Sequence, residues 1–136
     1  TMSYPAMIEA GVDVRLGTDG AASNNGLDMR AEAKAASLVQ KHDHWDATIL
    51  DPVETWKLAT KGSSDWVTWD LSDIRMRPRG RNSRRVLSNL VYSGARCMDV
   101  FVDGMAIRRS GETLTLDEKK VSLDLEEAAQ DYYSDI

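Results

Sequence analysis

Cysteine, histidine and long apolar runs are all scarce in this sequence. Its 136 residues include one cysteine, Cys97, and two histidines. A single cysteine excludes an internal disulfide framework, and its strand-like surroundings contain no nearby histidine, so we expect a buried, inert thiol. No stretch approaches the ~18 consecutive apolar residues of a membrane span, and no basic-then-apolar leader opens the chain. We therefore expect a cytoplasmic protein with no membrane partner.

The overall composition is that of a soluble globular domain. Hydrophobic residues make up 42% of the chain and charged residues 29%, with a formal net charge of -5. This apolar content is enough for a modest core.

The first half shows helical and strand-like patterns in alternation. We expect a short helix over residues 4–10, ended by Gly11, and then a strand over residues 12–16. Asn25 can cap a following helix, with Asp28 in its first turn. The apolar stripe of that helix recurs at steps of three or four: Leu27, Ala31, Ala35, Leu38 and Val39. This order is typical of a parallel α/β architecture.

A further short helix is expected within residues 51–62, and the residue pattern then changes from helical to strand-like. Asp51 would cap this helix and Gly62 would end it. Beyond it, "DWVTWDL" alternates like a strand, and an Asp103-Gly104 turn predicts a hairpin. The acidic tail, residues 117–136, predicts an amphipathic helix packed on this β element. We thus divide the chain into residues 1–62, helices around a strand, and residues 63–136, a β element with a C-terminal helix.

Asp19 is the candidate for chemistry. It follows a predicted strand and precedes a helix, the place where α/β proteins carry reactive groups. The small residues beside it leave room for a substrate or a metal ion. A carboxylate there could bind a metal or move a proton, or it could simply stabilise a turn before Gly20. Asn24 and Asn25 pose the same choice between helix cap and substrate contact.

Four blocks in fixed order carry a resemblance to a known family. They are "MIEAGVDVRLGTDGAASNNGLDM", "ATKGS", "DWVTWDLSDIRMRPRG" and "SNLVYSGARCMDVFVDGMAIRRSGETLTLDEKKV". Together they resemble the C-terminal portion of the metal-dependent amidohydrolase superfamily, in the branch of S-adenosylhomocysteine and methylthioadenosine deaminases and triazine chlorohydrolases. The resemblance covers nearly all of the chain.

The resemblance implies a fold, a metal and a set of site residues. The fold would be the last βα units of a (β/α)8 barrel, followed by part of a small β-sandwich and a C-terminal helix. Asp19 would bind the catalytic zinc, or iron, and accept a proton from the attacking water. Ser23 and Asn24 would line the pocket for a nucleoside-like or other N-heterocyclic substrate.

Several parts of the family pattern are missing. The His-x-His pair, the later single histidines and the acid/base glutamate of the family have no counterpart here, and one carboxylate cannot replace the three or four protein ligands that zinc takes. Ser63 and Ser64 join two blocks almost directly where the family carries further residues. A whole barrel takes about 250 residues. We therefore expect a missing N-terminal segment or association with another copy to cover exposed strand edges.

The other polar and aromatic residues are expected to have structural or solvent-exposed roles and not to bind ligands. His42 and His44 follow the predicted helix, and we expect them in an interhelical loop and not as ligands. The arginine-rich run over residues 75–85 could bind nucleic acid, but a solvated loop paired with acids is favoured, so no nucleic-acid partner is expected. Trp66 and Trp69 differ by an odd step and should face opposite sides of a strand.

Two functions of different classes remain. The chain is the C-terminal part of a metal-dependent aminohydrolase, inactive alone, or it is a noncatalytic assembly domain derived from such an enzyme. Dependence of activity on Asp19 in a completed assembly separates them.

Overall fold

The structure is a computed structural model that describes residues 2–134, and it contains two compact units. The first unit comprises the residues up to Ser63 together with Leu71–Ala95, and the second comprises Ser64–Asp70 together with the residues from Arg96 onward. The segment Leu71–Ala95 therefore returns to the helical unit after the first strand of the β element.

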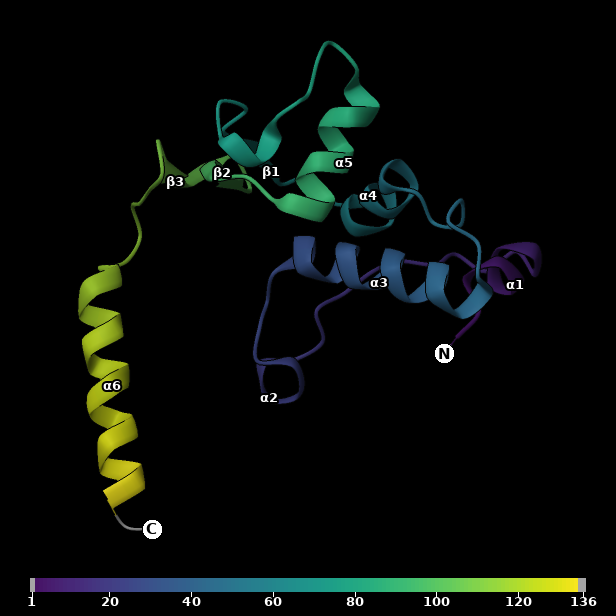
Figure 1. Cartoon of the computed structure of the whole chain (residues 1–136). Helices are drawn as coiled ribbons and strands as arrows, with labels where there is room; N and C mark the ends of the chain where they lie inside the picture. Colours follow the sequence, from purple (N-terminus) through teal and green to yellow (C-terminus); the bar gives the residue numbers. More distant parts are fainter. Residues whose placement is uncertain (1, 135–136) are drawn as a thin grey trace. The chain divides into compact units, whose positions relative to one another are not determined.

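The first unit is helical (Figure 1). Its elements are α1 (Tyr4–Glu9), α2 (Ala21–Asn24), α3 (Met29–His44), α4 (Pro52–Thr60), the 3-10 helix η1 (Ile74–Met76) and α5 (Ser83–Ser93). The predicted helices over residues 4–10 and 51–62 are confirmed by α1 and α4. Sequence patterns missed η1 and α5, because the arginine-rich run that leads into α5 resembles a solvated loop.

The expected strand over residues 12–16 does not form. This segment is irregular, and its Leu16 N–H donates a hydrogen bond to the Leu58 carbonyl of α4 at 3.2 Å. A strand needs a neighbouring strand to complete its ladder of hydrogen bonds. Within residues 2–134 no strand pairs with this segment.

Asp28, and not Asn25, caps helix α3. The Asp28 carboxylate accepts hydrogen bonds from the backbone N–H groups of Arg30 and Ala31. Asn25 instead ends α2 with a positive φ of 51°. The predicted cap at Asp51 is confirmed, since its carboxylate accepts from the N–H groups of Val53 and Glu54.

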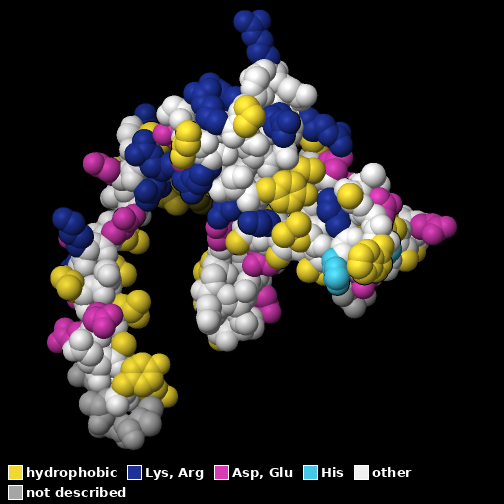
Figure 2. All heavy atoms as spheres, in the orientation of Figure 1, with side chains coloured by type: hydrophobic (Ala, Val, Ile, Leu, Met, Phe, Trp, Pro, Cys, Tyr) yellow, Lys and Arg dark blue, Asp and Glu magenta, His cyan; other side chains and the backbone are white. Residues whose placement is uncertain are grey.

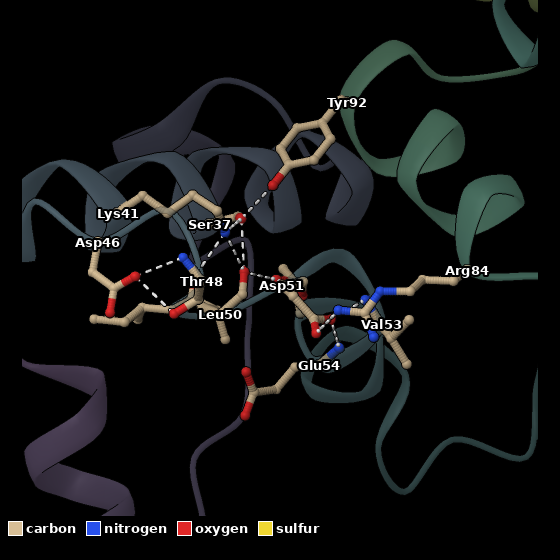
Figure 3. A network of polar contacts seen from close by, with 12 residues as sticks. Ser37, Lys41, Asp46, Thr48, Leu50, Asp51, Val53, Glu54, Arg84 and Tyr92 are labelled. Atoms are coloured by element: carbon tan, nitrogen blue, oxygen red, sulfur yellow. Dashed lines mark hydrogen bonds and ion pairs between the residues drawn. The ribbon is translucent and has the colours of Figure 1, made fainter.

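A small core and a polar network hold the helical unit together. Tyr4, Val14 and Leu50 form the buried apolar cluster. Beside it, the buried Ser37 hydroxyl donates to the Leu50 carbonyl at 2.8 Å and lies 2.8 Å from the Tyr92 hydroxyl (Figure 3). The Lys41 ammonium donates to the same Leu50 carbonyl at 2.8 Å. The network thus joins α3 to the segment before α4 and to α5.

The second unit is a four-stranded antiparallel sheet in the order β1-β2-β3-β4. Its strands are β1 (Trp66–Trp69), β2 (Cys97–Val102), β3 (Met105–Arg109) and β4 (Glu112–Thr113). The predicted hairpin is confirmed: Asp103 and Gly104 both have positive φ, 50° and 77°, as a tight turn between twisted strands requires. Trp66 stacks on Phe101 of β2, with ring centroids 3.8 Å apart.

The tail forms the predicted helix α6 (Glu118–Ser134), and residues 135–136 lie outside the described residues. Its first residue is held, since the Glu118 carboxylate accepts from Arg108 Nη1 at 3.0 Å. Hydrophobic side chains are visible along this helix in Figure 2. Its large apolar residues are exposed, including Leu123 and Leu125 at 71% and 70%. The expected packing of this helix on the β element is therefore not seen among the described residues. None of the helices described has the length and apolarity to cross a bilayer.

Candidate active site

Asp19 lies in an exposed loop that we call the Asp19 loop, residues 17–28, which contains the short helix α2. Its backbone adopts the left-handed conformation, with φ of 57°. One carboxylate oxygen accepts a hydrogen bond from the Gly20 N–H at 2.8 Å, and the other accepts from the Ser23 hydroxyl at 2.9 Å. The carboxylate is therefore oriented by its own loop before any ligand arrives.

These hydrogen bonds also favour the charged form of Asp19. The Ser23 hydroxyl first, and the Gly20 N–H second, lower the pKa of Asp19 below its ordinary value. The side chain is exposed, so its negative charge is presented to solvent and to anything that binds over the loop. An ionised, oriented carboxylate can bind a cation or accept a proton.

The other two predicted site residues lie in the same loop as Asp19. Besides its bond to Asp19, the Ser23 hydroxyl lies 2.9 Å from the Gly20 carbonyl oxygen. The Asn24 amide donates to the Thr18 carbonyl at 2.9 Å and to Glu32 Oε1 at 2.7 Å. The loop thus uses both residues for its own structure. Glu32, a half-buried residue in the first turn of α3, was not predicted; its sequence signal is only that of an acid favoured near a helix N-terminus.

The described residues do not form a complete metal site. Among residues 2–134 no group of three or more His, Cys, Asp or Glu side chains is placed to hold an ion. Asp19 fits a metal as a single oxygen ligand, while zinc takes about three or four protein ligands. The remaining ligands would have to come from outside the described residues.

His42 and His44 lie in the last turn of α3, so the expected interhelical loop is wrong. Residues two apart on a helix point about 200° apart around its axis, which prevents joint chelation. Both ring nitrogens of His44 have protein partners: Nε2 lies 3.0 Å from the Ser3 hydroxyl and Nδ1 lies 3.0 Å from the Gln40 carbonyl. The His42 ring lies beside Trp45, at 5.7 Å between centroids.

The surroundings of Cys97 and of two arginines in the arginine-rich run are those of structural residues. Cys97 is half-buried in β2 and not fully buried as expected, and this partial burial raises the pKa of its thiol and keeps it protonated. Arg75 pairs with Asp73 at 2.6 Å and Arg84 pairs with Asp51 at 2.7 Å. These two pairs agree with a run whose arginines are balanced by acids.

A solved structure of known chemistry shares this fold. It is an adenosine deaminase from Xanthomonas campestris crystallised with bound zinc, with a TM-score of 0.80 and 28% sequence identity. The match covers 95% of this chain and 33% of that one. No protein-family model matches the chain. The fold therefore resembles about a third of a zinc-bound adenosine deaminase.

Curated relatives narrow the resemblance further. The chain is 41% identical over 133 residues to a 5-methylthioadenosine/S-adenosylhomocysteine deaminase of Bacillus cytotoxicus, and 41% identical over 136 residues to the enzyme of that name from Bacillus thuringiensis. Each match includes 85% of this chain and 30% of the relative, so the chain spans about a third of the length of the proteins it matches. The resemblance predicted from the four sequence blocks is confirmed.

Proposed function

We propose that this chain is the C-terminal part of a zinc-dependent aminohydrolase that deaminates a nucleoside-like or other N-heterocyclic substrate in the cytoplasm. Asp19 is its contribution to the active site. The observation that carries the proposal is the oriented, ionised Asp19 carboxylate in a chain that matches deaminases over most of its length.

In this proposal residues 1–62 are the last units of a (β/α)8 barrel and residues 63–136 contribute to its β-sandwich and C-terminal helix. The irregular segment over residues 12–16 would become the final barrel strand once a neighbouring strand pairs with it. The Xanthomonas campestris neighbour, which is three times as long as the part it shares with this chain, supports such a completion.

Asp19 has two tasks in this assignment. It would supply one oxygen ligand to the metal, and its carboxylate would accept a proton from the water that attacks the substrate. Zinc, when bound, supplies a Lewis acid that lowers the pKa of water. The neighbour crystallised with zinc supports this ion over iron. Ser23 orients Asp19 through their 2.9 Å hydrogen bond, and in the completed pocket Ser23 and Asn24 would lie beside the substrate.

The second candidate function is a noncatalytic assembly domain. The exposed apolar side chains of α6, such as Leu123 and Leu125, favour it because such surfaces usually contact another protein. In either case the chain by itself would be inactive and would associate with another copy or with a missing segment.

A chimaeric enzyme tests the proposal. This chain would replace the matching C-terminal segment of the Bacillus thuringiensis deaminase, and ammonia release from S-adenosylhomocysteine would be measured. We expect activity in the chimaera and a loss of at least ~100-fold in kcat/KM for Asp19→Asn, because the amide can neither accept the proton nor carry the charge.

Asp46→Asn is the matched control. Asp46 is also an exposed carboxylate held by its own turn, accepting from the Thr48 N–H at 2.8 Å and from the Thr48 hydroxyl at 2.7 Å. Activity should survive this change. An active chimaera that is indifferent to Asp19→Asn would favour the assembly domain instead.

A further inference from the structure

The Asp19 loop has no buried side chain to fix it. Every residue from Asp19 to Asp28 is exposed. A loop with so little apolar contact opens easily unless polar contacts hold it. The position of Asp19 must therefore depend on hydrogen bonds from the loop to a rigid element.

Asn24 makes such a link. Its side-chain nitrogen donates to the Thr18 carbonyl, directly before Asp19, and to Glu32 Oε1, at 2.9 and 2.7 Å. Glu32 stands in the first turn of α3, which is capped by Asp28 and anchored by the fully buried Ala33. The link therefore runs from a fixed helix to the main chain at the candidate catalytic residue.

The backbone of Asp19 needs this support. A φ of 57° is uncommon for a non-glycine residue and is kept only where the surroundings determine it. The Thr18 hydroxyl also donates to the Asp19 carbonyl, at 3.1 Å. The carbonyl groups of Thr18 and Asp19 thus both accept hydrogen bonds. The bond to the Asp19 carbonyl comes from within the loop, and the Thr18 carbonyl is connected through Asn24 to α3.

We propose that Glu32 is a positioning residue: through Asn24 and the Thr18 carbonyl it holds the backbone of Asp19 in place. The assignment rests on the proposed catalytic role of Asp19. It also gives Asn24 a different task from the substrate contact expected from sequence, since its amide N–H groups are used inside the protein.

Two substitutions separate positioning from chemistry. Glu32→Ala removes the acceptor, whereas Glu32→Gln keeps an oxygen for the Asn24 amide and removes only the charge. Lys34→Ala, at an exposed position of the same helix, is the control for alanine in α3.

The first measurement uses the 136-residue chain and needs no activity. The backbone N–H groups of Ser23 and Asn24 both donate to the Gly20 carbonyl, so their exchange with solvent, followed by NMR, reports opening of the loop. Glu32→Ala should raise their exchange about tenfold, the effect of losing one hydrogen bond to a charged group. Glu32→Gln and Lys34→Ala should change it much less. Unaltered exchange in Glu32→Ala would overturn the proposal.

The second measurement uses the chimaera. Glu32→Ala should lower kcat by about 10- to 100-fold with a smaller change in KM, because a displaced catalytic group slows chemistry more than binding. Glu32→Gln should restore most of kcat. Equal damage in both variants, with normal exchange in Glu32→Gln, would mean that the carboxylate itself acts. If the unsubstituted chimaera is inactive, the proposed function fails, while exchange still decides whether Glu32 holds the loop.

Discussion

At the scale of single residues, Asp19 and Asp46 show what local geometry can and cannot establish. Both are exposed, both accept from a nearby N–H and a nearby hydroxyl, and in both these bonds lower the pKa of the carboxyl group. A turn-stabilising role therefore explains Asp46 completely and would explain Asp19 equally well. Asp19 differs from Asp46 in its left-handed backbone and in the hydrogen bond that joins its loop, through Asn24, to Glu32, and it lies in a chain similar to deaminases.

Tyr4 gives a prediction about pH. Burial first, and the hydrogen bond to Glu54 second, raise the pKa of Tyr4 from 10.0 to about 12. The fold thus favours the neutral phenol, and this contribution is complete below pH 10 and lost as the pH rises toward 12. Urea unfolding should show a free energy of unfolding that falls over this range, and Tyr4→Phe should reduce the fall. An identical pH dependence in both proteins would contradict the assignment.

At the scale of elements, the cap of α4 yields a stability prediction. Asp51 accepts from two N–H groups at the helix start and pairs with Arg84 of α5 at 2.7 Å. Asp51→Ala should lower the free energy of unfolding by about 1 kcal/mol, the usual effect of removing a cap. Asp51→Asn keeps a capping oxygen and should cost less than Asp51→Ala.

The pH dependence of stability separates the two contributions of Asp51 to the free energy of unfolding, its helix cap and its ion pair with Arg84. The backbone N–H of Glu54 is the main group that lowers the pKa of Asp51. The resulting stabilisation is present above the ordinary pKa of Asp and is lost as the pH falls through the lowered value. Chemical denaturation at neutral pH and near pH 3 measures it, with Arg84→Ala as the control for the ion pair. If the free energy of unfolding of Asp51→Asn depended on pH as strongly as that of the unsubstituted protein, the Asp51 carboxylate would not be the source of this pH dependence.

The elements also show which sequence signals are sufficient. Local signals predicted α1, α4 and the β2–β3 hairpin, because a cap, a proline or an Asp-Gly turn acts within a few residues. Residues 12–16 carry an apolar strand pattern, but a strand depends on a partner that the pattern does not contain. Helix α5 was missed because the arginine-rich run at its start resembles a solvated loop. The apolar residues that α5 buries, Leu90 and Val91, lie near its end. The candidate site was found only in part, since Glu32 contacts the loop through a fold that sequence spacing does not reveal.

At the scale of the whole molecule, much apolar surface is uncovered. Leu27, Leu38 and Val39, three members of the predicted stripe, are 64%, 47% and 45% exposed. The buried side of α3 is instead formed by smaller or polar residues, namely Ala33, Ser37 and Gln40. Since the chain matches only 33% of the zinc-bound neighbour, we propose that further polypeptide covers the exposed stripe. A periodic pattern predicts an apolar face and leaves its partner unspecified.

Metal content is the prediction that belongs to the whole molecule. The purified chain, dialysed exhaustively and analysed by mass spectrometry, should retain far less than one equivalent of zinc, because Asp19 alone cannot replace the ligand set. The chimaera should retain close to one equivalent, and Asp19→Asn should reduce its zinc affinity. One equivalent in the isolated chain would contradict this expectation and indicate ligands shared between copies or supplied by His42. Loss of that metal in His42→Gln would then identify the histidine, whereas loss only on dilution to monomers would identify a site built by two copies.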